Sequence, residues 1–497
     1  METLQRTANR GSISTGYDID NSLKLEEANL ECINTPSSYS LITASNVYKG
    51  TTSFWIKRTS LNNGSGVQWL FNGSNSSRYD GIYWDANDKL KGYFSALGNG
   101  ADFVTTQVFR DTSAWYHIVM AIDTSLSTAS ERIKIYVNGE QITDWDTSPS
   151  IDQNTQLTSL GTDAYHGWGT SYSYNLGVSS DGSSEYLANC IHIDGQQLTS
   201  TDFGEFDEDS GIWKPKAYTG TYGNKGYLLE FQSSSALGTD TSGNGNNFTN
   251  NRNITSADQA TDTPTNNFCT LFPPPAAVTG TEPSVKEGGT TMFGGVSNTQ
   301  NAFGTMGVRS GKWYFESTIT NSGGVTTNNH NFGVIDPEQI TYVMTSGRDI
   351  GASPAGWACA SDSLPRNNNA SASGANATGS LAENEIMGVA IDMDNGKIWW
   401  HRQGTWTSIN STVGDPANGT TPAFSNLLTA TDNFVIPAGG FYINNGNQTR
   451  AMNFGGYAQA VFTAVGTYTD ANGYGSFAYQ PPSGYYALCT KNLAEYG

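Results

Sequence analysis

Basic residues are scarce in this sequence. Among 497 residues, 25 are Lys or Arg against 45 Asp or Glu, which gives a formal net charge of −20 at pH 7. Such an excess of negative charge repels phosphate backbones and anionic lipid headgroups that come within a Debye length. The composition therefore argues against nucleic acid as a partner.

Long apolar runs are also missing. No window approaches the roughly 18 consecutive apolar residues of a membrane helix. The opening segment METLQRTANRGSIST lacks the apolar core of a signal peptide. These absences predict a soluble protein that is made in a cytoplasm and does not insert into a membrane.

Cysteine and histidine show none of the spacings of common metal or catalytic sites. The five cysteines are far apart and form no paired C-x-x-C motifs, which predicts buried free thiols. The five histidines have no H-E-x-x-H or other ligand spacing, so no zinc site is expected. Neither a phosphate-binding Gly-x-x-x-x-Gly-Lys loop nor a serine hydrolase elbow occurs, so nucleotide enzymes and serine hydrolases have no support.

Glycine and aromatic residues are abundant, with 56 Gly, 25 Tyr and 12 Trp. Short alternating runs are bounded by Gly, Asn, Asp or Ser, the pattern of strands in a β-sandwich. In RIKIYVNG (132–139), Ile133, Ile135 and Val137 share one face of a strand. Asn138-Gly139 then forms a hairpin turn, because both residues adopt φ > 0 readily. We predict an all-β protein.

A polar and then proline-rich stretch separates two blocks of such strands. Three consecutive prolines at 273–275 favour an extended segment that gives no donors to a sheet. We predict an N-terminal arm over residues 1–14 and a first β-sandwich over 15–270. These are followed by a linker over 271–289 and a second β-sandwich over 290–497, which ends in a closing strand.

One acidic stretch invites an enzymatic interpretation. In DFGEFDEDSGIWKP (202–215), Glu205, Asp207 and Asp209 alternate, as carboxylates on one face of a strand would. The glycine before them and the Ser-Gly after them indicate a turn instead. We interpret the stretch as a solvated acidic loop and predict no catalytic residue.

The segment DTSGNGNN (240–247) is the best metal candidate. Asp240, Ser242 and Asn244 present oxygen atoms at alternating positions among glycines, as calcium ligands do. The segment lacks the further carboxylates of tight calcium sites, and Asx-rich turns also form without metal. Calcium is the one cofactor that the sequence suggests, with a metal-free turn as the alternative.

The loop DAYHGWGTSYSYN (163–175) is the candidate ligand-binding site. It places Tyr165, His166, Trp168 and Tyr172 among small residues, which suits an aromatic platform for a sugar. Core packing is the alternative for some of these side chains. Trp168 lies between two glycines, however, and is hard to place in a strand.

The order of the motifs resembles two known families. SAWYHIVMAIDTS, followed by ERIKIYVNGEQIT, resembles the laminin G and concanavalin A-like jelly rolls. Residues 185–249 resemble the version of this domain in virion structural and tail-fibre proteins of tailed bacteriophages. SGKWYFESTIT, NFGVID, GVAIDMDNGKIWWHRQGTW and NFGG resemble the SPRY domain, a bent β-sandwich that usually binds proteins. The resemblance implies a jelly roll over 15–270 followed by a SPRY-like sandwich.

The pairing of these modules implies a bacteriophage virion protein without enzyme activity. We expect a tail fibre or tail-associated receptor-binding protein, made in the host cytoplasm and present as a homo-oligomer. Its partners would be other virion proteins and a host-surface glycan or protein receptor, and residues 1–14 are a candidate anchor to the particle.

Two alternatives stay open. The closest is a capsid decoration protein or head fibre, and the lack of a heptad region and of a repeated shaft favours a compact spike or decoration over a long fibre. A tail-borne polysaccharide depolymerase would instead use the acidic stretch, including Glu205 and Asp207.

Overall fold

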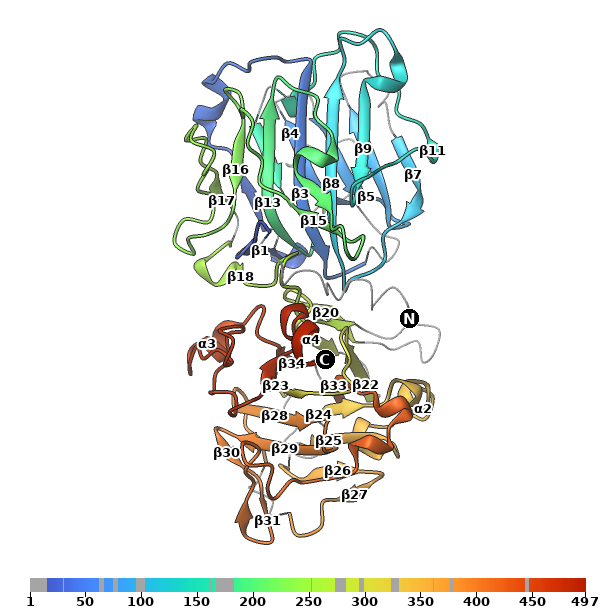
Figure 1. Ribbon diagram of the computed structural model, residues 1–497, viewed down its shortest axis with the longest axis vertical. Helices are drawn as coiled ribbons and strands as arrows, with labels where there is room; N and C mark the ends of the chain where they lie inside the picture. The colour runs from blue at the N-terminus through green and yellow to red at the C-terminus, as the bar shows by residue number, and fades with distance from the viewer. Residues whose placement is uncertain are drawn as a thin grey trace. The chain divides into compact units, whose positions relative to one another are not determined.

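The computed structural model describes residues 16–497, apart from residues 30, 62–66, 75–78, 95–102, 161–162, 167–182, 252, 273–282, 295–298, 323–329, 361, 376–379 and 443–446. The chain divides into two compact units, the first ending at Asn266 and the second beginning at Asn267 (Figure 1). The predicted arm over 1–14 lies outside the described residues. In the described part of the chain, no helix is long and apolar enough to cross a membrane.

The first unit is a sandwich of two antiparallel sheets. One sheet has the order β10-β9-β8-β3-β13-β1-β18, with β16 also paired to β13. The other has the order β11-β7-β6-β5-β4-β12-β2-β17. The first sheet consists of β1 (Ser22–Leu25), β3 (Lys49–Arg58), β8 (Trp115–Asp123), β9 (Ile133–Val137), β10 (Glu140–Gln141), β13 (Glu185–Asp194), β16 (Tyr227–Leu229) and β18 (Gln259–Ala260). The second consists of β2 (Cys32–Asn34), β4 (Gln68–Ser74), β5 (Tyr79–Trp84), β6 (Lys89–Phe94), β7 (Phe103–Val108), β11 (Trp145–Thr147), β12 (Asp163–His166) and β17 (Thr249–Asn251).

Alternation along the strands builds the core of this unit. Phe54 of β3 lies opposite Ile118 of β8, and both are fully buried together with Trp84 of the other sheet. The hairpin from β9 to β10 turns at Asn138 (φ +49°) and Gly139 (φ +88°), so the predicted turn is confirmed.

The second unit is also a sandwich of two sheets. One has the order β19-β22-β33-β24-β25-β26-β27, and the other β20-β21-β34-β23-β28-β29-β30, with β35 parallel to β23. The first consists of β19 (Leu271–Phe272), β22 (Thr299–Gly304), β24 (His330–Ile335), β25 (Gly356–Ala360), β26 (Pro365–Asn367), β27 (Ala370–Ser371) and β33 (Ile436–Tyr442). The second consists of β20 (Ser284–Lys286), β21 (Thr291–Gly294), β23 (Lys312–Asn321), β28 (Ile386–Asp392), β29 (Lys397–Arg402), β30 (Thr405–Trp406), β34 (Gln448–Asn453) and β35 (Tyr486–Ala487).

Short elements complete the second unit. A two-stranded ribbon pairs β31 (Ser408–Ile409) with β32 (Thr412–Val413). The α-helices of the described chain are α2 (Ile340–Thr345), α3 (Ala460–Thr463) and α4 (Thr490–Tyr496), and several 3-10 turns join the strands.

The second unit begins earlier than the sequence suggested. The Cys269 N–H donates to the Leu488 carbonyl at 2.9 Å, and Phe268 forms an antiparallel bridge with Cys489. The closing segment of the chain thus holds residues 267–270 in the second unit rather than the first. β19 and β20 lie within the predicted linker over 271–289 but are strands of the second unit, and residues 273–282 lie outside the described residues.

All five cysteines are buried and free, so the prediction of buried thiols is confirmed. The five histidines are buried as well, each at most 2% exposed. Histidine therefore serves as an interior polar residue throughout the chain.

Candidate functional site

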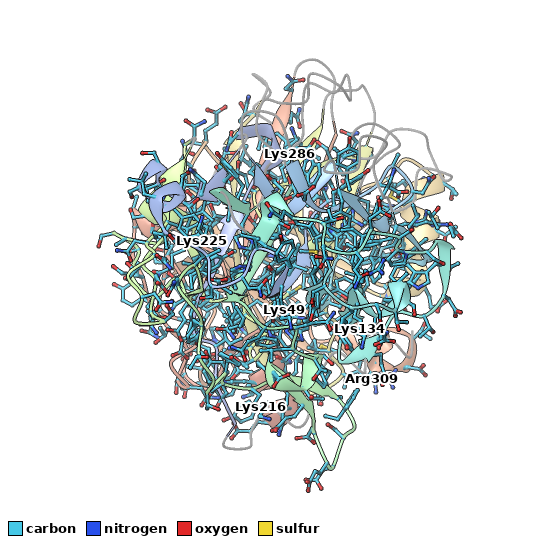
Figure 2. The ribbon with its side chains drawn as sticks, turned by 90° about the horizontal axis from the view of Figure 1, so that it is seen from above. Lys49, Lys134, Lys216, Lys225, Lys286 and Arg309 are labelled. Carbon is cyan, nitrogen blue, oxygen red and sulfur yellow. The ribbon has the colours of Figure 1, made fainter. Side chains whose placement is uncertain are left out.

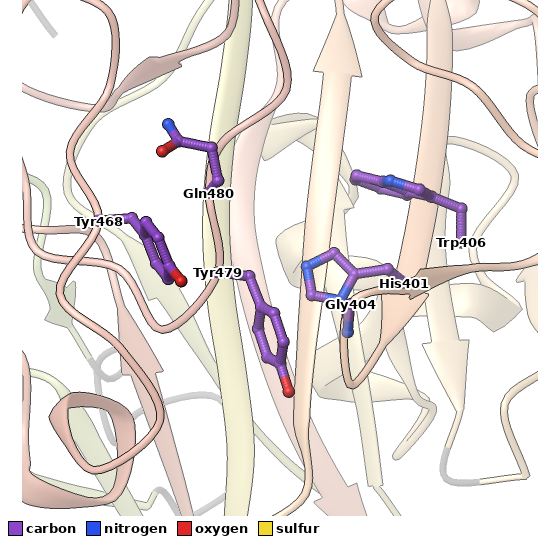
Figure 3. Close-up of a pocket in the computed structure, with 6 residues that line it drawn as sticks. All are labelled: His401, Gly404, Trp406, Tyr468, Tyr479 and Gln480. Carbon is purple, nitrogen blue, oxygen red and sulfur yellow. Dashed lines mark hydrogen bonds between the residues drawn. The ribbon is translucent and has the colours of Figure 1, made fainter.

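The second unit carries an open pocket of about 300 Å³ beside β30, the last strand of one sheet. Figure 3 shows its lining, which we call the aromatic pocket: His401, Gly404, Trp406, Tyr468, Tyr479 and Gln480. In this view His401 and Trp406 lie on one side, and Tyr468 and Gln480 lie on the other.

A two-residue turn builds the first wall of the aromatic pocket. Gln403 (φ +49°) and Gly404 (φ +76°) join β29 to β30, so His401 and Trp406 lie directly opposite each other on neighbouring strands. Their rings meet edge to face, with centroids 4.9 Å apart and planes at 85°. The turn geometry therefore sets where the indole lies.

The closing part of the chain supplies the second wall. The backbone N–H of Tyr479 donates to a carboxylate oxygen of Glu316 at 2.8 Å, and its hydroxyl donates to Gln403 Oε1 at 3.1 Å. The ring of Tyr479 lies 5.2 Å from that of His401. Tyr468 is fixed by a pair of 2.8 Å backbone hydrogen bonds with Phe477. Both tyrosines are thus anchored through their own backbone.

A chain of hydrogen bonds runs behind the pocket. The Gly404 N–H donates to His401 Nδ1 at 3.2 Å, so the imidazole proton is assigned to Nε2, which donates to the Tyr314 hydroxyl at 2.7 Å. That hydroxyl donates to Glu316 Oε1 at 2.9 Å. Burial lowers the pKa of His401 to about 3 and raises the pKa of Glu316 to about 7. His401 is therefore neutral near pH 7, with both ring nitrogens already bonded.

The chemistry of the aromatic pocket suits binding rather than proton transfer. Among the described residues, its lining includes no Asp, Glu, Lys or Arg. Tyr468 is 46% exposed, Trp406 is half-buried and Gln480 is exposed. Aromatic faces bind the C–H faces of a sugar ring, while amide and hydroxyl groups orient its hydroxyls.

The sequence did not single out this pocket. Its walls come from separate segments, residues 401–406 and 468–480, which only the folded sheet brings together. With 25 tyrosines in the chain, Tyr468 and Tyr479 carry no distinguishing signal. The one local hint is HRQGTW, where a turn-forming Gln-Gly is flanked by His401 and Trp406.

The described part of the predicted ligand-binding loop is buried more deeply than the aromatic pocket. Tyr165 is half-buried on β12, whereas His166 is fully buried and its Nε2 bonds to the hydroxyl of Tyr227 at 3.0 Å. Burial lowers the pKa of His166 to about 3. The assignment of His166 to a ligand-binding surface is therefore wrong, because its ring packs in the core. Trp168 and Tyr172 lie outside the described residues.

The three predicted calcium ligands lie in one turn. The carboxylate of Asp240 accepts hydrogen bonds from the N–H groups of Leu228, Ser242 and Asn246 at 2.8 to 2.9 Å. The side-chain amide of Asn244 donates to two backbone carbonyls of a neighbouring loop. These bonds account for the motif as an Asx-rich turn, and calcium binding stays a prediction.

The acidic stretch forms a small hairpin of β14 (Gly204–Phe206) and β15 (Trp213–Pro215). Asp207 accepts hydrogen bonds from the backbone N–H of Ser210 at 2.9 Å and from Lys214 Nζ at 3.2 Å. The bonds from Ser210, together with Lys214, lower the pKa of Asp207 to about 2. Asp209 lies in the turn, as predicted, whereas Glu205 lies on β14 and Asp207 is only 8% exposed. The prediction of a solvated loop over the whole stretch is therefore wrong in part, because the stretch pairs into a hairpin and Asp207 bonds to its turn.

Figure 2 labels four lysines of the first unit: Lys49, Lys134, Lys216 and Lys225. Lys49 and Lys134 each pair with a neighbouring carboxylate, at 2.6 and 2.5 Å. The charges of Lys49 and Lys134 are thus compensated within the first unit.

Comparison with known families supports the fold. Residues 33–175 match the family model described as the concanavalin A-like lectin/glucanases superfamily. The predicted all-β fold of two β-sandwiches is confirmed, and the family match lies in the first of them, the concanavalin A-like one. The SPRY-like character of the second sandwich stays a prediction. The comparison with curated protein sequences finds no match.

Three solved structures are among those similar to the chain. The SPRY domain of human HERC1 shares 16% identity at a TM-score of 0.25, over 33% of this chain and 89% of that one. Mouse laminin α1 domains LG4-5 share 11% at a TM-score of 0.30, over 85% and 83%. The native heptameric SAP-like pentraxin of Limulus polyphemus shares 14% at a TM-score of 0.27, over 37% and 81%.

Proposed function

We propose that the protein is a non-enzymatic recognition protein of a bacteriophage virion that binds a host-surface glycan through the aromatic pocket. The observation that carries the binding role is the pocket lining, in which Trp406, Tyr468 and Tyr479 surround an uncharged space with an amide at its rim. Such a lining, which combines aromatic faces with uncharged polar groups, suits a neutral polar ligand.

The geometry favours recognition over hydrolysis. Glycoside hydrolysis requires two carboxyl groups facing the bound sugar, one as acid and one as nucleophile or base. The nearest carboxyl group in the hydrogen-bond chain, Glu316, is fully buried behind Tyr314 and accepts bonds from the wall of the pocket. A sugar bound between Trp406 and Tyr468 is therefore held by stacking and uncharged groups.

The virion assignment depends on the sequence. Residues 185–249 resemble a jelly roll of phage structural and tail-fibre proteins, and the SPRY-like module follows it in the same chain. A tail-associated receptor-binding protein accounts for both this resemblance and a glycan-binding pocket. It would be present in several copies and would assemble with other virion proteins in the host cytoplasm.

Adsorption competition tests the function. Purified full-length protein is expected to reduce phage adsorption to host cells, and the Trp406→Ala variant is expected to lose this effect. Tyr342→Ala is the matched control, because Tyr342 is a 40% exposed tyrosine of the same unit outside the pocket. Equal inhibition by wild type and Trp406→Ala would contradict the proposal.

Location on the particle is tested separately by antibody-gold labelling of intact virions. The proposal predicts label on the tail. Label over the capsid would instead make the protein a head decoration, and the receptor-binding role would then be wrong even with a working pocket.

A further inference from the structure

Arg450 of β34 is a buried cation without a carboxylate partner in the described chain. It is 1% exposed, and its one hydrogen bond runs from Nη1 to Ser317 Oγ at 2.6 Å, while Nε has no partner. Burial lowers the pKa of Arg450 to about 9, which leaves it charged at neutral pH. An uncompensated charge in a protein interior is strongly unfavourable, so this guanidinium requires an explanation.

Buried cations of the first unit show the contrast. Lys24, Lys57 and Arg58 are as deeply buried as Arg450. Each has a carboxylate oxygen within hydrogen-bonding distance, at 2.9, 2.7 and 3.0 Å respectively. Carboxylates thus compensate these three cations, and the buried Arg132 donates instead to three backbone carbonyls. Arg450 has neither a carboxylate partner nor such a set of carbonyl acceptors among the described residues.

His330 of β24 is a second exception in the same unit. It is 1% exposed, and neither ring nitrogen has a hydrogen-bond partner among the residues that the structure describes. Each of the other four histidines bonds through at least one ring nitrogen, to Ser53, Tyr227, Thr52 or Tyr314. Buried hydrogen-bond donors and acceptors normally have partners. His330 is therefore a second buried polar side chain that lacks the hydrogen bonds expected of it.

The two exceptions lie close together between the sheets. The guanidinium of Arg450 lies 5.4 Å from the ring centre of Phe332, which is two residues after His330 on the same face of β24. Gly439, opposite Phe332 on β33, leaves room for the Arg450 stem, since a Cβ there would come within 3.2 Å of Arg450 Cδ. The positive charge of Arg450 adds to burial in lowering the pKa of His330 to about 3.

The sequences of the segments next to these strands contain no carboxylate. Residues 295–298, 323–329 and 443–446, which adjoin β22, β24 and β33, read GVSN, GGVTTNN and INNG and contain no Asp or Glu. A negative charge near Arg450 must therefore come from outside these parts of the sequence.

We propose that Arg450 and His330 bind a small monovalent anion, a halide or a carboxylate, between the two sheets of the second unit. The Nε–H of Arg450 and one ring N–H of His330 are the donors, and the anion neutralises the buried guanidinium. A charged donor and a neutral one on facing strands match an acceptor with a single negative charge. This site is separate from the aromatic pocket and does not depend on the proposed function.

Thermal unfolding in chloride tests the site. Sodium chloride is exchanged for sodium gluconate at constant ionic strength, with full-length protein, because gluconate is too bulky for a buried site. A rise in Tm of about 2–4 °C is expected for the second unit when chloride is raised tenfold from near its Kd. Arg450→Met is expected to abolish the rise, while Arg309→Met, which removes an exposed cation of the same unit, is expected to keep it.

Formate in place of chloride separates the two kinds of anion: a rise with formate alone identifies a carboxylate site, and a rise with chloride identifies a halide site. Equal Tm in chloride, formate and gluconate would overturn the proposal, as would a rise that persists in Arg450→Met. If Arg450→Met does not fold, crystals of the wild type grown in sodium bromide decide the question. An anomalous peak beside Arg450 Nε is expected, and its absence at this position would overturn a halide site.

Discussion

The imidazole of His401 and the indole of Trp406 meet edge to face across a two-residue turn, with ring centroids 4.9 Å apart. This pair fixes one wall of the aromatic pocket through local sequence, whereas the opposite wall is delivered by residues 468–480. Ligand binding in the aromatic pocket therefore depends on how well residues 468–480 pack against the sheet.

Gly404→Ala is expected to disturb the pocket and destabilise the second unit. A Cβ at Gly404 would lie 2.9 Å from Tyr479 Cδ1, in addition to the strain of φ +76°. Gly484→Ala is the matched control, because Gly484 has φ +80° and nothing within 4 Å of its Cβ position. Both variants lose about 1 kcal/mol from backbone strain, and Gly404→Ala loses more. Urea unfolding measures the difference, and equal losses would contradict the close approach of Tyr479 to this turn.

Glu316→Ala is expected to cost about 3 kcal/mol or more of unfolding free energy, because it removes the acceptor for several buried donors. These include the N–H groups of Ala478 and Tyr479 and the amide of Asn453. Protease sensitivity of the segment after Phe477 is expected to rise in parallel. A variant as stable and as resistant as the wild type would show that Glu316 does not hold this wall.

Glu185 gives the first unit a predictable dependence on pH. Its side chain is fully buried near Arg58, and burial raises its pKa to about 8. Because the unfolded carboxyl titrates near 4.3, this group stabilises the fold fully at low pH. Its contribution falls as pH rises from about 4.3 to about 8.

Glu185→Gln is accordingly expected to match the wild type near pH 4 and to exceed its stability at pH 9, by about 1.4 kcal/mol for each unit of pKa shift. Calorimetry at both pH values follows the transition of the first unit. Parallel pH profiles for wild type and variant would show that Glu185 ionises without penalty.

Asp262 holds a buried polar cluster of the first unit. Its carboxylate pairs with Lys57 Nζ at 2.7 Å and accepts the indole N–H of Trp115 at 3.0 Å. Asp262→Ala is expected to destabilise the unit by about 3–5 kcal/mol, since it leaves a buried ammonium uncompensated. The double variant Asp262→Ala with Lys57→Met is expected to recover part of this loss in chemical unfolding. No recovery would mean that the charge of Lys57 is not the cause.

The turn at 240–247 is expected to be stable without calcium. Asp240 already accepts three backbone N–H groups, so millimolar calcium is expected to leave Tm of the first unit unchanged. A rise in Tm that is lost in Asn244→Ala would favour the ion site that the spacing of Asp240, Ser242 and Asn244 suggested.

Local patterns allowed much of the fold to be predicted. The turn at Asn138-Gly139 was predictable because both residues readily adopt positive φ. The burial of the cysteines was predictable because a free thiol is a small apolar group. Both properties belong to the residues themselves and do not depend on distant parts of the chain. His166 was misjudged because its surroundings in sequence are glycines and aromatic residues, while its surroundings in space are core rings such as Phe71. Arg450 gave no signal, since only sheet packing shows that it lacks a carboxylate partner among the described residues.

The aromatic pocket is expected to bind uncharged sugar rings, and direct binding to an array of neutral hexose and N-acetylhexosamine oligosaccharides tests this. Wild-type protein is expected to bind at least one of these glycans, and folded Trp406→Ala is expected to bind it at least tenfold more weakly, a loss of about 1.4 kcal/mol. Tyr342→Ala is expected to bind like the wild type. Binding that Trp406→Ala retains in full, or no binding to any neutral glycan, would contradict the account.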